Sequence, residues 1–61
     1  MPEIIVYAVE GRTPEVKKAL MREITEAVVR NFGVAAENVV VQIVESPKDS
    51  KSRGGIPFAE R

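Results

Sequence analysis

The sequence predicts a small α+β fold in which one helix joins two parallel β-strands, followed by a short C-terminal hairpin or strand. Three observations predict it: a β-branched apolar run near the amino terminus, apolar residues at helical spacing in the middle, and a second β-branched run. With 61 residues the chain has room for one domain, which we place over residues 1–61.

The first strand is predicted over residues 4–9, Ile-Ile-Val-Tyr-Ala-Val. A nearly continuous apolar run of this kind is typical of a strand that is covered on both faces. The segment Glu10-Gly11-Arg12 ends the strand with a turn residue.

The helix is predicted to begin after Thr13, which can cap the free amides, with Pro14 at the first helical position. Apolar residues at three- and four-residue spacing then predict one buried stripe: Val16, Leu20, Ile24, Ala27, Val28 and Phe32. Charged residues, Lys17 among them, fall mainly off this stripe and predict a solvated face. Gly33 is the expected stop of a helix roughly 28 Å long.

The second strand is predicted over residues 39–44. Because the helix is long enough for a crossover, the two strands should run parallel with a right-handed connection. Residues 46–55 are polar and predict an ordered loop, and residues 56–59 predict a short terminal strand or hairpin that Pro57 restricts to an edge.

Self-association is expected from the size of the chain. A fold of this length buries only about 60% of its unfolded surface, and small folds usually add disulfides, metal or association. Cys and His are both absent, which removes disulfides and the two commonest transition-metal ligands. Two strands and one helix cannot cover two apolar strand faces, so we expect the hidden faces to meet another subunit.

Composition argues against several function classes. Nine basic and nine acidic residues are scattered, unlike the basic patch of a nucleic-acid-binding protein. No apolar run approaches the ~20 residues of a membrane span, and the amino terminus lacks a secretory signal pattern. We therefore expect a cytoplasmic protein without nucleic-acid or membrane partners.

The common catalytic groups are also missing, because the chain has no His base, no Cys nucleophile and no Gly-rich phosphate loop. One unusual group is left: Pro2 follows Met1, and removal of Met1 leaves a secondary amine at the start of a strand. A model α-amino group titrates near ~7.7–8.0, and partial burial or a nearby cation favours its neutral form, as a general base requires. If Met1 is retained, the Pro2 nitrogen is a tertiary amide and should be inert.

Nearly the whole chain resembles the 4-oxalocrotonate tautomerase family. The combination of Pro2 with Glu10-Gly11-Arg12 in so short a chain is the most specific part of the match. The resemblance continues through further segments: residues 4–6, 17–20, 24–28, 39–45, 47–49 and 54–55.

The resemblance implies a cofactor-independent isomerase built from β-α-β units, paired into dimers and commonly into a hexamer of three dimers. Such an enzyme interconverts enol or dienol and keto forms of small 2-hydroxy and 2-oxo acids. Pro2 would be the general base, and Arg12 would reach in from a neighbouring subunit to bind a substrate carboxylate, which the planar guanidinium can grip in two places.

The sequence departs from the family pattern at two positions. A second family arginine falls at Val40, whose side chain cannot donate a hydrogen bond, and a loop aromatic falls at Lys51. Lys51 and Arg53 are candidates to supply the missing cation, with exposed loop cations as the alternative. Val9, at a family pocket-wall position, and Phe58 are candidates to line the pocket, or else belong to the core or an interface.

Two other functions stay open at this point. A related activity would add water to, or remove halide from, an unsaturated acid, but no carboxylate can be assigned to activate water. The chain could instead be a partner-dependent or non-catalytic subunit, since hetero-oligomeric relatives divide the catalytic residues between chains. The sequence does not identify the physiological substrate.

Overall fold

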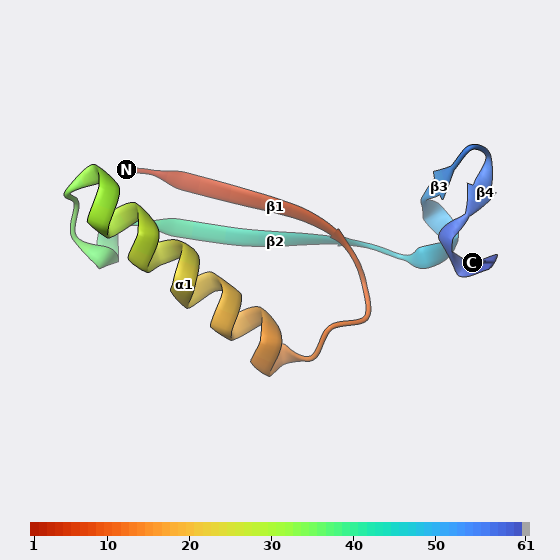
Figure 1. Ribbon diagram of the computed structural model, residues 1–61, viewed down its shortest axis with the longest axis horizontal. Coiled ribbons are helices and arrows are strands. Elements are labelled where there is room, and N and C mark those ends of the chain that lie inside the picture. The colour runs from red at the N-terminus through yellow and green to blue at the C-terminus, as the bar shows by residue number, and fades with distance from the viewer. Residues whose placement is uncertain (61) are drawn as a thin grey trace.

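The computed structural model describes residues 1–60 and confirms a β-α-β arrangement followed by a C-terminal hairpin (Figure 1). The helix and strands are β1 (Glu3–Val9), α1 (Pro14–Phe32), β2 (Val40–Ser46), β3 (Ser52–Arg53) and β4 (Ile56–Pro57). Short 3₁₀ turns lie at Ala36–Asn38, Lys48–Ser50 and Phe58–Glu60. Arg61, the last residue of the predicted domain, lies outside the described residues.

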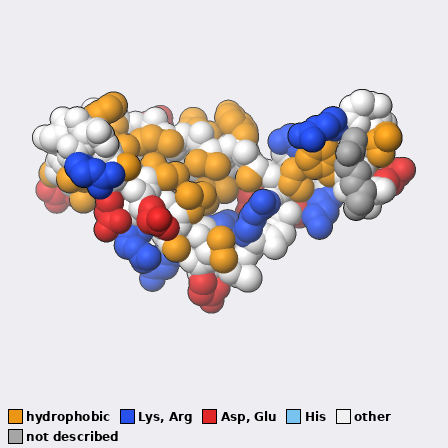
Figure 2. Space-filling view, viewed as in Figure 1, with side chains coloured by type: hydrophobic (Ala, Val, Ile, Leu, Met, Phe, Trp, Pro, Cys, Tyr) orange, Lys and Arg blue, Asp and Glu red, His pale blue; other side chains and the backbone are white. Residues whose placement is uncertain are grey.

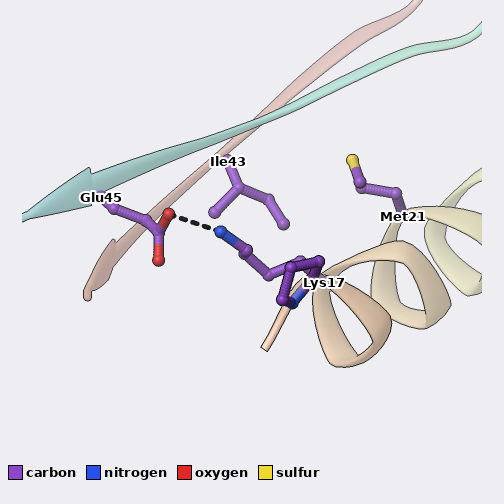
Figure 3. A pocket seen from close by; sticks show the side chains of 5 residues that line it. Lys17, Met21, Ile43 and Glu45 are labelled. Carbon is purple, nitrogen blue, oxygen red and sulfur yellow. Dashed lines mark hydrogen bonds and ion pairs between the residues drawn. The ribbon is translucent and has the colours of Figure 1, made fainter. Parts of the chain in front are cut away.

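β1 and β2 pair in parallel, as predicted, with a register that runs from Glu3 opposite Val40 to Val9 opposite Ser46. Partners in this register share a face of the sheet, and successive residues alternate between faces. Ile43 points toward α1 (Figure 3), which assigns Val6, its partner in β1, to the helix-covered face. The residues between them, Tyr7 and Val44 for example, belong to the other face.

That other face has no cover within the chain. Tyr7 is 72% exposed, Ile5 is 45% exposed and Val40 is 37% exposed. No residue among 1–60 is fully buried. One helix can pack on only one side of a two-stranded sheet, so cover on the second face, which the sequence assigns to another subunit, stays a prediction.

Helix α1 begins and ends where the sequence predicts. The Thr13 hydroxyl accepts a hydrogen bond from the Val16 N–H at 3.3 Å, and Gly33 ends the helix in the left-handed conformation with φ of 69°. The predicted buried stripe is only partly right, because Val16, Leu20 and Phe32 are exposed. The stripe is wider than two strands can cover, so part of its apolar surface is left outside the chain's own packing.

The C-terminal region differs from the predicted loop. Residues 46–55 contain the end of β2, one 3₁₀ turn and strand β3, which pairs antiparallel with β4. Gly54 and Gly55 form the connecting turn with φ of 62° and 82°, a conformation that glycine adopts without a Cβ clash. Pro57 lies in β4, which pairs with β3 alone, so its missing N–H interrupts no ladder.

The chain is elongated, with dimensions of 43 × 22 × 13 Å. Its radius of gyration is 14.6 Å, whereas a compact domain of this length is expected near about 10.5 Å. The excess comes from the hairpin, which stands beyond the carboxyl end of β2, at the opposite end from the amino terminus (Figure 1). Hydrophobic side chains gather over the strands and the helix, and Lys and Arg side chains flank the hairpin (Figure 2).

Candidate active site

Pro2 lies immediately before β1, next to the start of β2. Its carbonyl oxygen accepts a hydrogen bond from the Val40 N–H at 3.0 Å, so the backbone of Pro2 is held at the edge of the sheet. The preceding residue, Met1, is 88% exposed. The structure therefore brings together Pro2 and Val40, two of the residues predicted for the site, and leaves Met1 exposed.

Arg12 lies in the turn that follows the other end of β1. Its Nη1 donates a hydrogen bond to the Val9 carbonyl at 2.9 Å, and its side chain is exposed. The seven residues of β1 separate this turn from Pro2, which at about 3.3 Å per residue is about 23 Å. Pro2 and Arg12 of one chain are therefore too far apart to hold the same small molecule.

Lys51, Arg53 and Phe58 belong to the hairpin region. The Phe58 N–H donates a hydrogen bond to the Lys51 carbonyl at 2.8 Å. The Arg53 guanidinium carbon lies 5.7 Å from the centre of the Phe58 ring, which is cation–π distance. Phe58 is half-buried and Arg53 is exposed, so the ring supports the cation at the surface of the hairpin.

The seven predicted site residues thus form two groups at opposite ends of the chain. Pro2 and Val40 make the first group. The second group contains Val9, the three candidate cations and the aromatic ring: Val9, Arg12, Lys51, Arg53 and Phe58. A site that uses members of both groups needs at least two chains.

A pocket of about 260 Å³ lies between α1 and β2, lined by Pro14, Lys17, Met21, Ile43 and Glu45 (Figure 3). The Lys17 Nζ and the Glu45 carboxylate form an ion pair at 2.8 Å. Lys17 therefore faces the sheet, and the prediction that it belongs to a solvated helix face is wrong. None of the predicted site residues lines this pocket, and its charges neutralise one another, so it is not the candidate active site.

The sequence prediction missed Glu10, which it treated only as part of a turn. The Glu10 carboxylate accepts a hydrogen bond from the Lys48 N–H at 3.2 Å, and the Glu10 N–H donates to the Ser46 carbonyl at 3.0 Å. Glu10 and Lys48 are 38 residues apart in the chain, so no local pattern indicates the contact.

Residues 1–60 contain neither a metal-binding cluster nor a helix suited to a membrane. No cluster of three or more His, Cys, Asp or Glu side chains is placed to hold a metal ion. No helix in this part of the chain has the length and apolar character needed to cross a membrane.

Comparison with known proteins finds tautomerases both by family model and by sequence similarity. The family model described as tautomerase enzyme matches residues 2–61. A probable tautomerase of Bradyrhizobium diazoefficiens is 54% identical over 61 residues, covering 100% of this chain and 91% of the relative. A 2-hydroxymuconate tautomerase of Pseudomonas sp. (strain CF600) is 40% identical over 60 residues, covering 98% of this chain and 95% of the relative.

Solved structures agree with the sequence matches. The crystal structure of a 4-oxalocrotonate tautomerase homologue superposes with a TM-score of 0.93 at 36% identity, covering 100% of this chain and 97% of the other. A heterohexamer 4-oxalocrotonate tautomerase from Chloroflexus aurantiacus J-10-fl superposes with a TM-score of 0.87 at 33% identity, covering 98% of this chain and 97% of the other.

Proposed function

Because the chain belongs to the tautomerase family, we propose that it interconverts the enol or dienol and keto forms of small 2-hydroxy and 2-oxo acids without a cofactor. The name of the Pseudomonas relative, a 2-hydroxymuconate tautomerase, supports this class of substrate. Such an acid is small enough for one base and one or two cations to bind and transform it.

The observation that carries the proposal is the position of Pro2. It is the second residue, its backbone is anchored to Val40 at the edge of the sheet, and Met1 before it is exposed. Once Met1 is removed, the Pro2 nitrogen is a secondary amine with a free lone pair. It takes the proton from the enol hydroxyl, the carbonyl forms as the electron pair moves to carbon, and the resulting ammonium returns a proton to that carbon.

Arg12 binds the substrate carboxylate in this proposal, and it comes from a neighbouring chain. The roughly 23 Å span of β1 separates it from Pro2 of its own chain, which is longer than a small acid. Among residues 1–60 its guanidinium bonds to the nearby Val9 carbonyl through Nη1, and its other N–H groups can make a bidentate carboxylate contact.

Lys51 and Arg53 are the candidates for the second cation, because Val40 has no donor. The segments beside Pro2, residues 1–5 and 33–42, contain no Lys or Arg at all. In this proposal the cation that stabilises the developing oxyanion comes from another chain of an assembly, and the candidates are the exposed Arg53 and the half-buried Lys51 of the hairpin region. Val9 and Phe58 supply apolar lining beside these groups.

A homo-oligomer, with a trimer of dimers as the expected form, completes the proposal. The uncovered sheet face of Ile5, Tyr7 and Val40 and the exposed part of the helix stripe are apolar surfaces that a neighbour can bury. Burial of these surfaces would also compensate for the small core of the single chain.

The test uses one sequence in two forms, with Met1 removed and with Met1 retained, each verified by mass spectrometry. Ketonisation of 2-hydroxymuconate or the enol of phenylpyruvate is followed for both, beside Pro2→Ala and a control, Pro14→Ala. We expect turnover only without Met1, and a loss on the order of a hundredfold or more in Pro2→Ala with little change in Pro14→Ala. Equal turnover with Met1 present would rule out Pro2 as the base.

A second candidate is favoured by one specific observation. The Chloroflexus relative is a heterohexamer, and this chain has Val40 where the family pattern has an arginine. The chain would then be a partner-dependent subunit. A purified chain that assembles alone and turns over an enol acid excludes this candidate, and a requirement for a second chain supports it.

A further inference from the structure

Glu10 joins two segments that are distant in sequence. Its N–H donates to the Ser46 carbonyl at 3.0 Å, and its carboxylate accepts from the Lys48 N–H at 3.2 Å. The first segment is the turn after β1, and the second leaves β2 toward the hairpin. One residue therefore holds both segments through two hydrogen bonds, one from its backbone and one from its side chain.

The two segments carry the cations of the candidate site. Arg12 follows Glu10 by two residues, and Lys51 and Arg53 follow Lys48 within five. The segments also lie near each other at Gly11, where an added Cβ would reach van der Waals distance, 3.9 Å, of the Lys48 Cε. Gly11 has φ of 130°, a conformation that side chains rarely adopt, so the approach of the two segments depends on glycine.

We propose that Glu10 is a positioning residue that sets the place of Arg12 relative to the segment leading to Lys51 and Arg53. This inference rests on the proposed function, because it assumes that Arg12 binds the substrate carboxylate. In this proposal Glu10 does not itself touch the substrate. Its carboxylate accepts a hydrogen bond from the Lys48 N–H, and it would repel the carboxylate of the substrate.

Glu10 can act in this way because it limits the conformational freedom of the turn that carries Arg12. The turn at residues 10–13 contains Gly11, its side chains are exposed, and the Arg12 guanidinium bonds to the Val9 carbonyl at the end of β1. Thr13 joins the turn to α1, and the Glu10 carboxylate joins it to the segment that leads to the hairpin, through the Lys48 N–H. Without the Lys48 contact the arginine samples more positions, and binding must then order it at a cost in affinity.

The experiment compares three substitutions at one position. Glu10→Gln keeps an oxygen that can accept from the Lys48 N–H, Glu10→Asp keeps the charge but is one methylene too short to reach it, and Glu10→Ala removes the contact. Glu26→Ala, at an exposed carboxylate on α1, is the control. Kinetics on 2-hydroxymuconate are measured on variants whose oligomeric state matches the parent chain.

We expect Glu10→Ala and Glu10→Asp to raise KM on the order of tenfold with a smaller change in kcat, and Glu10→Gln to stay within about twofold of the parent. In an Arg12→Ala background the effect of Glu10→Ala on KM should disappear, since there is no arginine left to position. A merely structural role would lower thermal stability in both backgrounds and leave KM unchanged.

Two results would overturn the inference. One is a Glu10→Asp variant with an unchanged KM, and the other is a Glu10→Ala effect of equal size with and without Arg12. If Glu10→Ala does not assemble, the Asp and Gln variants still decide between the outcomes. If the parent chain itself has no turnover, or Arg12→Ala has no effect on KM, the proposed function fails rather than the role of Glu10.

Discussion

The two ends of the β1–β2 sheet differ in charge and in chemistry. The end with Pro2 contains a candidate base and apolar neighbours, with Glu3 and Glu37 in the segments beside Pro2 and Arg30 in the last turn of α1. The end with the Arg12 turn and the hairpin holds the candidate cations and an aromatic ring, but no candidate base. Under the proposed function, the difference means that one chain carries two halves of a site that an assembly joins.

The strongest test of whether Pro2 and Arg12 of one site come from different chains is to mix two inactive variants. Pro2→Ala lacks the base and Arg12→Ala lacks the carboxylate anchor, so each alone should lose most of its kcat/KM. In co-expressed mixed oligomers, about one quarter of the sites should recover both residues, because each site draws Pro2 and Arg12 from different chains. Activity of the mixture in a ketonisation assay measures this directly.

The matched control co-expresses Pro2→Ala with the double variant Pro2→Ala/Arg12→Ala, in which no site can regain the base. If the first mixture shows only the average of its two components, Pro2 and Arg12 do not act in one shared site.

Placing a cation beside Pro2 should reduce the difference in charge between the two ends of the sheet. Val40→Arg puts a guanidinium next to Pro2, where the Val40 N–H already bonds to the Pro2 carbonyl. We expect the ratio of kcat/KM for a dicarboxylic over a monocarboxylic enol acid to rise about tenfold, because a charge-assisted hydrogen bond contributes about 1.5–3 kcal/mol. Val40→Leu, which keeps the site apolar, should leave the ratio unchanged.

Removing cations from the hairpin tests the other end. Lys51→Ala and Arg53→Ala should each be assayed for kcat on the same acid, and the residue that acts on the substrate oxygen should lower kcat by about tenfold or more. Arg53→Lys separates charge from stacking, because lysine keeps the charge and loses the planar contact with Phe58. Unchanged turnover in both alanine variants would mean that these are simply exposed loop cations.

The smallest effect is expected away from both ends, at the ion pair between α1 and β2. Lys17 and Glu45 are 29% and 28% exposed, so solvent screens their interaction. Lys17→Met should change the free energy of unfolding by about 1 kcal/mol or less, with kcat/KM preserved. Chemical denaturation and the ketonisation assay measure the two quantities, and a large loss of turnover would link this pair to the site.

Some features of the molecule were predictable because their causes are local. The helix begins at Thr13-Pro14 and ends at Gly33 since capping and glycine conformation act within a few residues. The parallel pairing of β1 and β2 follows from the length of the crossover helix. The hairpin at Ile56–Pro57 was indicated in part, but its partner Ser52–Arg53 was hidden in a polar segment that has no strand pattern.

By itself, the sequence determined the β-α-β order, the single candidate base at Pro2 and the absence of a cation at position 40. Only the tertiary structure decided which distant groups meet: Lys17 is turned onto Glu45, and Glu10 is bonded to Lys48. The contacts of Lys17 and Glu10 span 28 and 38 residues. Such contacts depend on how the elements pack, and periodicity and capping describe only the elements themselves.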